Sequence, residues 1–586
     1  MKYRLYNDNE PLSSTVSQIL YNRGIPVEEQ QAYLNASYDS IHSWHDFPED
    51  DTKYAVSKLC EILEDEDPIF IVVDCDVDGF TSAAILANYI NEVYPKYIQK
   101  GLLTFGFHEG KQHGLADMMD KIPPWTRLVV CPDSASGDFE QHNQLINEFG
   151  VDDVIVLDHH HCDEESKWAT VLNNQMCDYP CKALTGAGVT WQFCRAFDEL
   201  CEFDIFKHDP TYLLDLCALG NQADMADFRD PEIKAIVTCG FDNITNPLIQ
   251  AIVNKNKASM DKCRGGLTYM GFAFYVAPYI NAICRSGTLE EKELVFNAML
   301  EYMADTEVSS TRRGHTDEEV PLVDEAVRVL FAVKRRQTDA QNHAMSMIEY
   351  KIFENNLLDD NAIVIECDED DAIDPGITGL VANKIQATYQ KPTIVVNNNG
   401  EVLRGSGRNY GKCPIEDFRK VCEDTEYVNF AQGHAGSFGI EIPQEQFENF
   451  IKALNESYAN IDMTPVYWVD YVFRNNYMPA KIISDIAGMK SLWGQNIQEP
   501  LVALDRICLS SDNVQLLSPN KSPTLKITVK GVEIMKFKSS QEEYEKFIKD
   551  NTVLTAVCTC SVNNYMGKST PQLIIEDFEL NQEWVF

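Results

Sequence analysis

One short stretch constrains the fold of this chain more than any other, because an apolar run in it stops abruptly at three carboxylates. Residues 71–79 read IVVDCDVDG, and the β-branched residues before Asp74 are typical of a fully buried parallel strand. In an open α/β sheet the ligand site lies just beyond the carboxyl ends of the strands, which would place Asp74, Asp76 and Asp78 there. Carboxylates so close together repel one another unless a cation joins them, and their oxygen ligands suit Mg²⁺ or Mn²⁺ better than zinc.

Two other interpretations of this stretch stay open. It could be a solvated acidic turn between a strand and a helix. The D-x-D-x-D spacing also occurs in calcium loops, but there a helix precedes the loop and a glutamate closes it at the twelfth position. No such glutamate follows here.

The same pattern of apolar run followed by acid recurs downstream. Strands are expected at 102–107, 127–131 and 153–157, with helical segments between them, and this alternation predicts a doubly wound parallel sheet. The second of these runs leads to Asp133 and the third to Asp158. A further apolar segment, residues 211–220, precedes Asp224, which we expect at the same kind of strand end.

The resulting candidate ligands are carboxylates and one imidazole, without sulfur: Asp74, Asp76, Asp78, Asp133, His159 and Asp224. Such a set fits two ions about 3.5–4 Å apart that hold both sides of an in-line phosphoryl displacement. His160 could then face the substrate phosphate or the leaving group as a donor. His161, the next residue, is a weaker candidate because a single histidine is more often a structural residue.

Composition sets broad limits on the class of protein. A length of 586 residues suggests three or four domains, and a net charge of −42 argues against nucleic-acid binding unless a local basic channel or bound cations reverse the field. The 18 cysteines form no C-x-x-C pair, so we interpret them as reduced thiols of an intracellular protein. Without an apolar signal core or an uninterrupted membrane span, we expect a cytoplasmic, nucleoid-associated protein with no membrane partner.

The distal half carries features that suit a polymeric substrate. A helix is expected over about 318–354, with Pro321 in its first turn, long enough to reach from one lobe to another. Beyond it, closely spaced glycines would let backbone amides approach a phosphate. The candidate substrate-binding residues are Arg285, Arg404, Ser406, Arg408 and His434, of which Arg285, like Lys182, is a weaker candidate because a single basic residue is usually just solvated.

Short strands from about residue 464 onward predict a small β-barrel, with Gly531 near a hairpin turn. Such barrels hold single strands by base stacking and by positive charge along the backbone, although the domain could also simply brace the fold. The candidate contacts are Lys521, Lys526, Lys530, Lys536, Lys538 and Tyr565.

Several motifs, in order along the chain, resemble the DHH phosphoesterase superfamily and, within it, the RecJ family of single-strand-specific 5′→3′ DNA exonucleases. Asp158-His159-His160 is similar to the motif that names the superfamily, and DCDVDG resembles its first motif with Cys75 in place of the usual aromatic. LCALGNQADM, KALTGAGVTWQF, VAPYINAICRSG, DPGITGLVANKI, RGSGRN and QGHAGSFG resemble later segments. Two departures are an alanine two residues after Asp133, where the family has glycine, and Gln432 for the first glycine of a Gly-Gly-His.

The resemblance implies an enzyme that uses two Mn²⁺ or Mg²⁺ ions to hydrolyse single-stranded DNA from its 5′ end in repair, recombination or replication. By analogy Asp76, Asp78, Asp133, His159 and Asp224 would be metal ligands, with His160, Asp158 and Asp74 as catalytic residues. The strand would pass between the DHH lobe and its associated lobe, and a single-strand-binding protein or a helicase would be candidate partners. The alternatives are a DHH phosphodiesterase for short oligonucleotides or cyclic dinucleotides and a non-catalytic replication scaffold.

The resemblance also implies five segments: an N-terminal helical segment (1–62), a DHH catalytic domain (63–235), a connecting region with the long helix (236–355), a smaller α/β DHH-associated domain that binds substrate (356–463) and an OB-type β-barrel (464–586).

Overall fold

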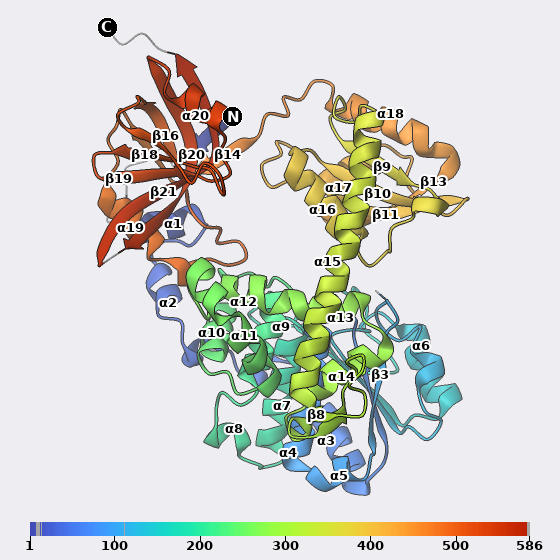
Figure 1. Ribbon diagram of the computed structural model, residues 1–586. Helices are drawn as coiled ribbons and strands as arrows, with labels where there is room; N and C mark the ends of the chain where they lie inside the picture. The colour runs from blue at the N-terminus through green and yellow to red at the C-terminus, as the bar shows by residue number, and fades with distance from the viewer. Residues whose placement is uncertain (7–11, 13, 111, 566, 583–586) are drawn as a thin grey trace. The chain divides into compact units, whose positions relative to one another are not determined.

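The computed structural model describes residues 1–6, 12, 14–110, 112–565 and 567–582. The chain forms two compact units, one made of residues 27–337 and 491–498 and the other of residues 1–26, 338–490 and 499–586. We call them the DHH unit and the distal unit. Figure 1 shows the helices and strands of each. The five predicted segments remain a prediction about how these units subdivide.

The DHH unit contains the predicted parallel sheet, with strand order β3-β2-β4-β5-β6 and every neighbouring pair parallel. Alternate residues of β2 face two different cores: Ile69, Ile71 and Val73 pack on one side, and Phe70 and Val72 on the other. A sheet buried on both faces explains the continuous apolar runs. The strands are β2 (Ile69–Val73), β3 (Leu103–Phe107), β4 (Leu128–Pro132), β5 (Asp153–Asp158) and an edge strand that the sequence did not reveal, β6 (Thr170–Asn173).

Helices cover this sheet, and their apolar side chains form a large core together with those of the strands. The main ones are α3 (Glu49–Asp65), α4 (Val77–Val93), α6 (Phe139–Gln144), α7 (Gly186–Leu200), α9 (Leu214–Ala223), α10 (Pro231–Asp242), α11 (Pro247–Arg264), α12 (Tyr269–Tyr275), α13 (Ala277–Ser286) and α14 (Leu289–Met299). The expectation that Asp224 follows a strand is wrong, because residues 214–223 form α9. All but the last residue of α9 are buried, and a short helix that is apolar on every side has the same local pattern as a buried strand.

The distal unit contains a five-stranded sheet of order β12-β13-β11-β10-β9, in which only β9 and β10 are parallel. Its strands are β9 (Ile363–Cys367), β10 (Thr393–Asn398), β11 (Val402–Arg408), β12 (Phe430–His434) and β13 (Ser437–Pro443), packed with α16 (Thr378–Tyr389), α17 (Phe418–Glu423) and α18 (Phe447–Tyr458).

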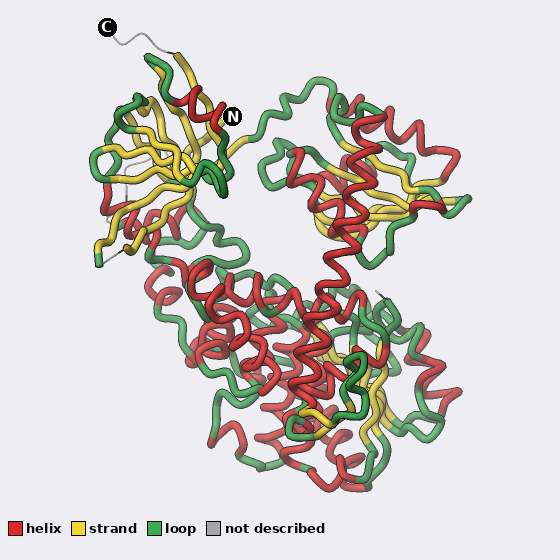
Figure 2. The backbone as a smooth tube through the Cα atoms, in the orientation of Figure 1, coloured by secondary structure: helices red, strands yellow, loops and turns green. Residues whose placement is uncertain are grey.

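The second sheet of this unit has seven strands in the order β15-β16-β20-β21-β19-β18-β17, mostly antiparallel. They are β15 (Tyr471–Arg474), β16 (Leu501–Cys508), β17 (Val514–Leu517), β18 (Thr524–Val529), β19 (Val532–Lys536), β20 (Thr552–Tyr565) and β21 (Lys568–Gln582), drawn in yellow in Figure 2. The expected hairpin is confirmed: β18 and β19 pair around Lys530 and Gly531, both with positive φ.

The beginning of the chain differs in part from the expected run of short helices. Residues 15–22 form α1 (Thr15–Asn22), but β1 (Lys2–Leu5) is a strand, parallel to β14 (Val466–Val469). The buried guanidinium of Arg23 anchors this segment, because it donates two hydrogen bonds to the carboxylate of Asp470, at 2.9 and 3.0 Å.

The long helix is confirmed as α15 (Leu322–Glu354), which starts directly after Pro321 rather than at residue 318. Leu322 and Leu330, near its start, belong to the core of the DHH unit, whereas Ile348 and Ile352 belong to a core of the distal unit. Figure 2 shows it as one continuous helix. Among the described residues, no helix combines the length and the apolar character needed to cross a bilayer.

Candidate functional site

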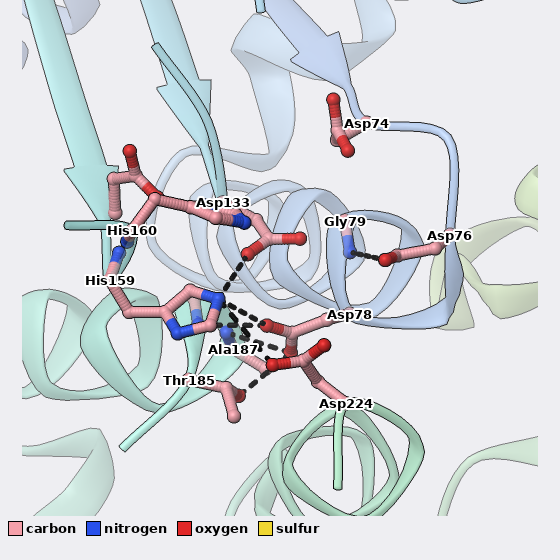
Figure 3. A network of polar contacts seen from close by, with 12 residues as sticks. Asp74, Asp76, Asp78, Gly79, Asp133, His159, His160, Thr185, Ala187 and Asp224 are labelled. Carbon is pink, nitrogen blue, oxygen red and sulfur yellow. Dashed lines mark hydrogen bonds and ion pairs between the residues drawn. The ribbon is translucent and has the colours of Figure 1, made fainter. Parts of the chain in front are cut away.

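The carboxyl ends of β2, β4 and β5 bring the predicted acidic residues together (Figure 3). Asp74 directly follows β2, and Asp76 is the N-cap of α4, where its carboxylate accepts a hydrogen bond of 3.1 Å from the amide of Gly79. Gly79 lies so close to Asp74 that a Cβ on it would be 2.5 Å from the Cβ of Asp74. The tight strand-to-helix turn therefore needs glycine at this position, and it directs both carboxylates to the same edge of the sheet.

Asp78 is fixed by the start of another helix. Its carboxylate accepts hydrogen bonds from the hydroxyl of Thr185 at 2.8 Å and from the amides of Gly186 and Ala187 at 2.8 and 3.1 Å. These donors are the N-cap and first turn of α7, where free amides and the helix dipole favour an anion. Asp78 is therefore held rigidly with its charge stabilised, although it is almost completely buried.

Asp133 follows β4 and meets the imidazole of His159. The Oδ1 atom of Asp133 lies 3.2 Å from Nε2 of His159. A Cβ on Gly186 would be 2.4 Å from that same oxygen, so this glycine too makes room for a carboxylate. The residue two positions later, Ala135, has φ +78°. Glycine adopts this conformation most readily, which explains why the family pattern has glycine where this chain has alanine. The departure does not move Asp133 away from the cluster.

Asp158, the last residue of β5, organises the two histidines that follow it. Its carboxylate accepts hydrogen bonds from the amides of Ser136, His159 and His160 and, at 2.8 Å, from Nδ1 of His160. Burial acts to raise the pKa of Asp158, but the hydrogen bond and charge of His160 outweigh it and lower that pKa. The same contact raises the pKa of His160 to about 9.

Asp224 reaches the cluster from the C-terminal end of α9. Its Oδ2 atom lies 3.7 Å from Nε2 of His159, and Oδ2 of Asp78 lies 3.8 Å from the same nitrogen. Partial burial and the charges of Asp78 and Asp76 raise the pKa of Asp224. His159 is thus shared by carboxylates from three segments that are distant in the sequence.

The electrostatics of this cluster call for a cation. Burial and neighbouring carboxylates raise the pKa values of Asp76 and Asp133. Among the described residues no lysine or arginine forms an ion pair with these carboxylates, and buried Oδ1 atoms of Asp74 and Asp133 accept no hydrogen bond. Donor atoms lie within 4.8 Å of one another in the sets Asp74–Asp76–Asp133, Asp78–His159–Asp224 and Asp133–His159–His160. An oxygen-rich set with one or two imidazoles fits Mg²⁺ or Mn²⁺.

Two functional candidates escaped the sequence analysis. His113, in the loop after β3, lies with Nδ1 2.6 Å from Oδ2 of Asp74, and the buried His108 lies with Nε2 3.4 Å from Oδ1 of Asp74. Burial acts to raise the pKa of Asp74, but these two contacts lower it. Nothing in the local pattern of HEGKQHG singles out these histidines, since only the pairing of β3 with β2 brings them to Asp74.

The predicted substrate-binding residues fall in both units. Arg285 is in α13 of the DHH unit, whereas Arg404, Ser406 and Arg408 are in β11 and His434 ends β12, all in the distal unit. Arg408 and His434 each pair with Ser437 of β13, so they share one face of that sheet.

The partners of these side chains separate the stronger from the weaker candidates. Arg404 forms an ion pair with Glu441, which offsets its charge, and Ser406 is buried with its hydroxyl 3.2 Å from that of Thr378. A Cβ on Gly379, in the first turn of α16, would be 2.3 Å from Nη2 of Arg408. The exposed His434 is therefore the better candidate for contact with a phosphate, whereas Nη1 of Arg408 already donates to the backbone carbonyls of Gly407 and Phe438.

Other basic candidates have structural partners. Lys182 donates to the backbone carbonyls of Asn174 and Cys177. In the seven-stranded sheet, Lys526 pairs with Glu533 and Lys536 with Glu543. These lysines are thus less available to nucleic acid than the sequence suggested, whereas Tyr565 is 66% exposed.

This fold and this site define a DHH-type phosphoesterase, and comparison with known proteins supports that class. The profile of the DHH family, N-terminal domain, matches residues 68–221, and that of the RecJ OB domain matches residues 469–577. The chain belongs to the DHH family, in its RecJ branch.

Individual relatives agree with this assignment. The prophage-derived YorK protein of Bacillus subtilis strain 168, described as a candidate single-strand DNA-specific exonuclease, is 31% identical over 99% of this chain and 98% of its own. The single-stranded-DNA-specific exonuclease RecJ of the same organism is 22% identical over 98% of this chain and 69% of its own. The crystal structure of RecJ with Mn²⁺ from Thermus thermophilus superposes with a TM-score of 0.69 at 19% identity, covering 99% of this chain and 79% of that one.

Proposed function

We propose that this protein is a metal-dependent exonuclease that hydrolyses phosphodiester bonds of single-stranded DNA from the 5′ end with two divalent ions. The observation that carries the proposal is the convergence of three carboxylates on His159, without a described lysine or arginine to balance them. They come from the first turn of α4 (Asp78), the end of β4 (Asp133) and the end of α9 (Asp224). The names of the relatives supply the substrate class and, through the family, the direction.

Asp76, Asp78, Asp133, His159 and Asp224 would hold the ions, and Asp74 would contribute from the end of β2. Two bound divalent ions would lower the pKa of a water and neutralise charge on the scissile phosphodiester. Mn²⁺ or Mg²⁺ suits this donor set, and the structure of RecJ from Thermus thermophilus is described in complex with either.

The residues around the ligands would prepare the reacting groups. Nδ1 of His160 donates a hydrogen bond to the carboxylate of Asp158. The other ring nitrogen, Nε2, would therefore contact the substrate and donate to a phosphate oxygen or to the leaving group. The hydrogen bond also fixes the orientation of the imidazole before the substrate arrives. The side chain of His160 is 55% exposed, which is compatible with this role.

The distal unit would bind the polymer. Arg408 and His434 share a face of the five-stranded sheet and would contact phosphate, and the OB domain would hold single-stranded DNA through exposed aromatics such as Tyr565. A substrate of one or two nucleotides does not need an OB domain. Comparing the turnover of a dinucleotide with that of a long strand separates the exonuclease from a phosphodiesterase for small substrates. Faster turnover of the dinucleotide would favour the phosphodiesterase.

The direct test is incubation of 5′- and 3′-labelled single strands with Mn²⁺, with product length followed over time. We expect the 5′ label to be released first. Asp224→Asn should abolish hydrolysis, because Asp224 contributes a negative charge to the cluster. Asp224 lies at the end of α9 and not in the central sheet, so we expect the variant to fold. Asp227→Asn is the matched control, because Asp227, three residues later, pairs with Arg229 instead. Full activity in Asp224→Asn would refute the site, and release of the 3′ label first would refute the direction.

A further inference from the structure

We propose that Asp74, Cys75 and His113 form a second cation site, for a soft divalent ion such as Zn²⁺, that shares Asp74 with the oxygen-rich cluster. Nδ1 of His113 lies 2.6 Å from Oδ2 of Asp74, and Nε2 of His113 lies 3.6 Å from Sγ of Cys75. One donor atom of each residue lies within 4.8 Å of the other two. The three side chains therefore offer oxygen, sulfur and nitrogen to the same small volume.

A second observation concerns the other oxygen of Asp74 and the imidazole of His108 beside it. Oδ1 of Asp74 and Nε2 of His108 are 3.4 Å apart and both buried, and apart from this contact neither atom has a polar partner among the described residues. The other ring nitrogen of His108 is engaged by Asp117 at 2.9 Å, which fixes the ring with Nε2 toward Asp74. Buried polar atoms without partners cost free energy, and a bound cation would satisfy this carboxylate and orient a further imidazole toward it.

The donor types decide which cation the site prefers. Sulfur and imidazole nitrogen favour Zn²⁺, whereas carboxylate oxygens favour Mg²⁺ and Mn²⁺. Cys75 is the residue that makes the difference, since it replaces an aromatic in the pattern that DCDVDG resembles. No described cysteine is disulfide-bonded, so the thiol of Cys75 remains available as a ligand.

Access is possible from one side. The side chain of His113 is 55% exposed, whereas Cys75 and Asp74 are buried beneath it. An ion would enter past His113 and reach the thiol and the carboxylate without displacing the sheet. The loop that carries His113 is held at Leu115, whose amide donates to Asp138 at 2.7 Å.

The site has a consequence for catalysis that rests on the proposed function. Asp74 is shared between this site and the set Asp74–Asp76–Asp133. A soft ion held by Cys75 and His113 would withdraw Asp74 from the oxygen-rich set. We therefore expect Zn²⁺ to inhibit Mn²⁺-supported hydrolysis.

The binding test uses Co²⁺ alone as a spectroscopic substitute for zinc on the full-length, metal-stripped protein. We expect a near-ultraviolet band from thiolate-to-cobalt charge transfer in the wild type, and its loss in Cys75→Ser and Cys75→Ala. His113→Ala should weaken Co²⁺ binding at least tenfold. The matched control is Cys60→Ser, a partly exposed thiol in α3 of the same unit, which should keep the band. No band in the wild type, or a band that persists in both Cys75 variants, overturns the proposal.

An inhibition test then separates this inference from the nuclease proposal. With each protein normalised to its own Mn²⁺-supported rate, the concentration of Zn²⁺ for half inhibition should be at least tenfold higher in Cys75→Ser than in Cys60→Ser. Equal sensitivity in the two variants contradicts the inhibitory role. A wild type that shows the cobalt band but hydrolyses no single-stranded DNA refutes the proposed function and leaves the cation site intact.

Discussion

Neutralising one carboxylate of the acidic cluster should stabilise the metal-free protein, which is the opposite of the usual effect of a substitution in a buried site. Asp133 is the sharpest case, because it is buried, its Oδ1 accepts no hydrogen bond from described residues, and burial together with the charges of neighbouring carboxylates raises its pKa. Asparagine keeps its shape and removes its charge. We therefore expect Asp133→Asn to unfold at higher denaturant concentration than the wild type in EDTA.

The size of the effect follows from the geometry. Donor oxygens of Asp74, Asp76 and Asp133 lie within 4.8 Å of one another. Two full charges at that separation repel by about 3.5 kcal/mol at an effective dielectric constant of 20. Proton uptake by the cluster relieves part of this repulsion, so we expect a gain of about 1–3 kcal/mol in the free energy of unfolding at pH 7.

The sign should reverse when Mn²⁺ is added. An ion that binds only the folded wild type stabilises it by about 2.7 kcal/mol at a concentration 100 times its Kd, and Asp133→Asn loses a proposed ligand for that ion. The assay is urea unfolding of each protein in EDTA and in Mn²⁺. Asp153→Asn is the control, because Asp153 begins the same strand that Asp158 ends and accepts a hydrogen bond from Tyr54.

Asp153→Asn, which lies outside the cluster, should not become more stable than the wild type in EDTA. The reasoning fails if Asp133→Asn is also less stable than the wild type in EDTA. It also fails if Mn²⁺ stabilises Asp133→Asn as much as the wild type.

Two further predictions concern the surroundings of the cluster. Because its hydrogen bond to Asp158 raises the pKa of His160 to about 9, above the value near 6.5 of an unfolded chain, this contact stabilises the metal-free fold fully below about pH 6.5 and is lost as the pH rises through 9. His160→Ala should therefore flatten the decline of stability between pH 6.5 and 9 in thermal unfolding, and an unchanged pH profile would contradict the assignment. Gly186→Ala should lower activity about a hundredfold, because its Cβ would meet Oδ1 of Asp133 at 2.4 Å and displace the carboxylate. Gly411→Ala, which has open space, is the control, and equal rates for the two variants would count against this geometry.

The sequence by itself determined the parallel sheet and most of the acidic site. A strand buried on both faces is a continuous apolar run, and the residue that follows it lies at the edge of the sheet, so IFIVV before Asp74 and LVVCP before Asp133 placed these carboxylates through local pattern alone. The His159 assignment rested on the same logic at the end of β5.

Only the tertiary structure decided which elements complete the site. Asp224 arrives from a buried helix, because a short segment that is apolar all round has no period that distinguishes helix from strand. The donors that hold Asp78 come from the start of α7, about 110 residues away, and His113 reaches Asp74 only because β3 pairs with β2. Contacts of this kind depend on how distant segments pack, and no local pattern of residues encodes them.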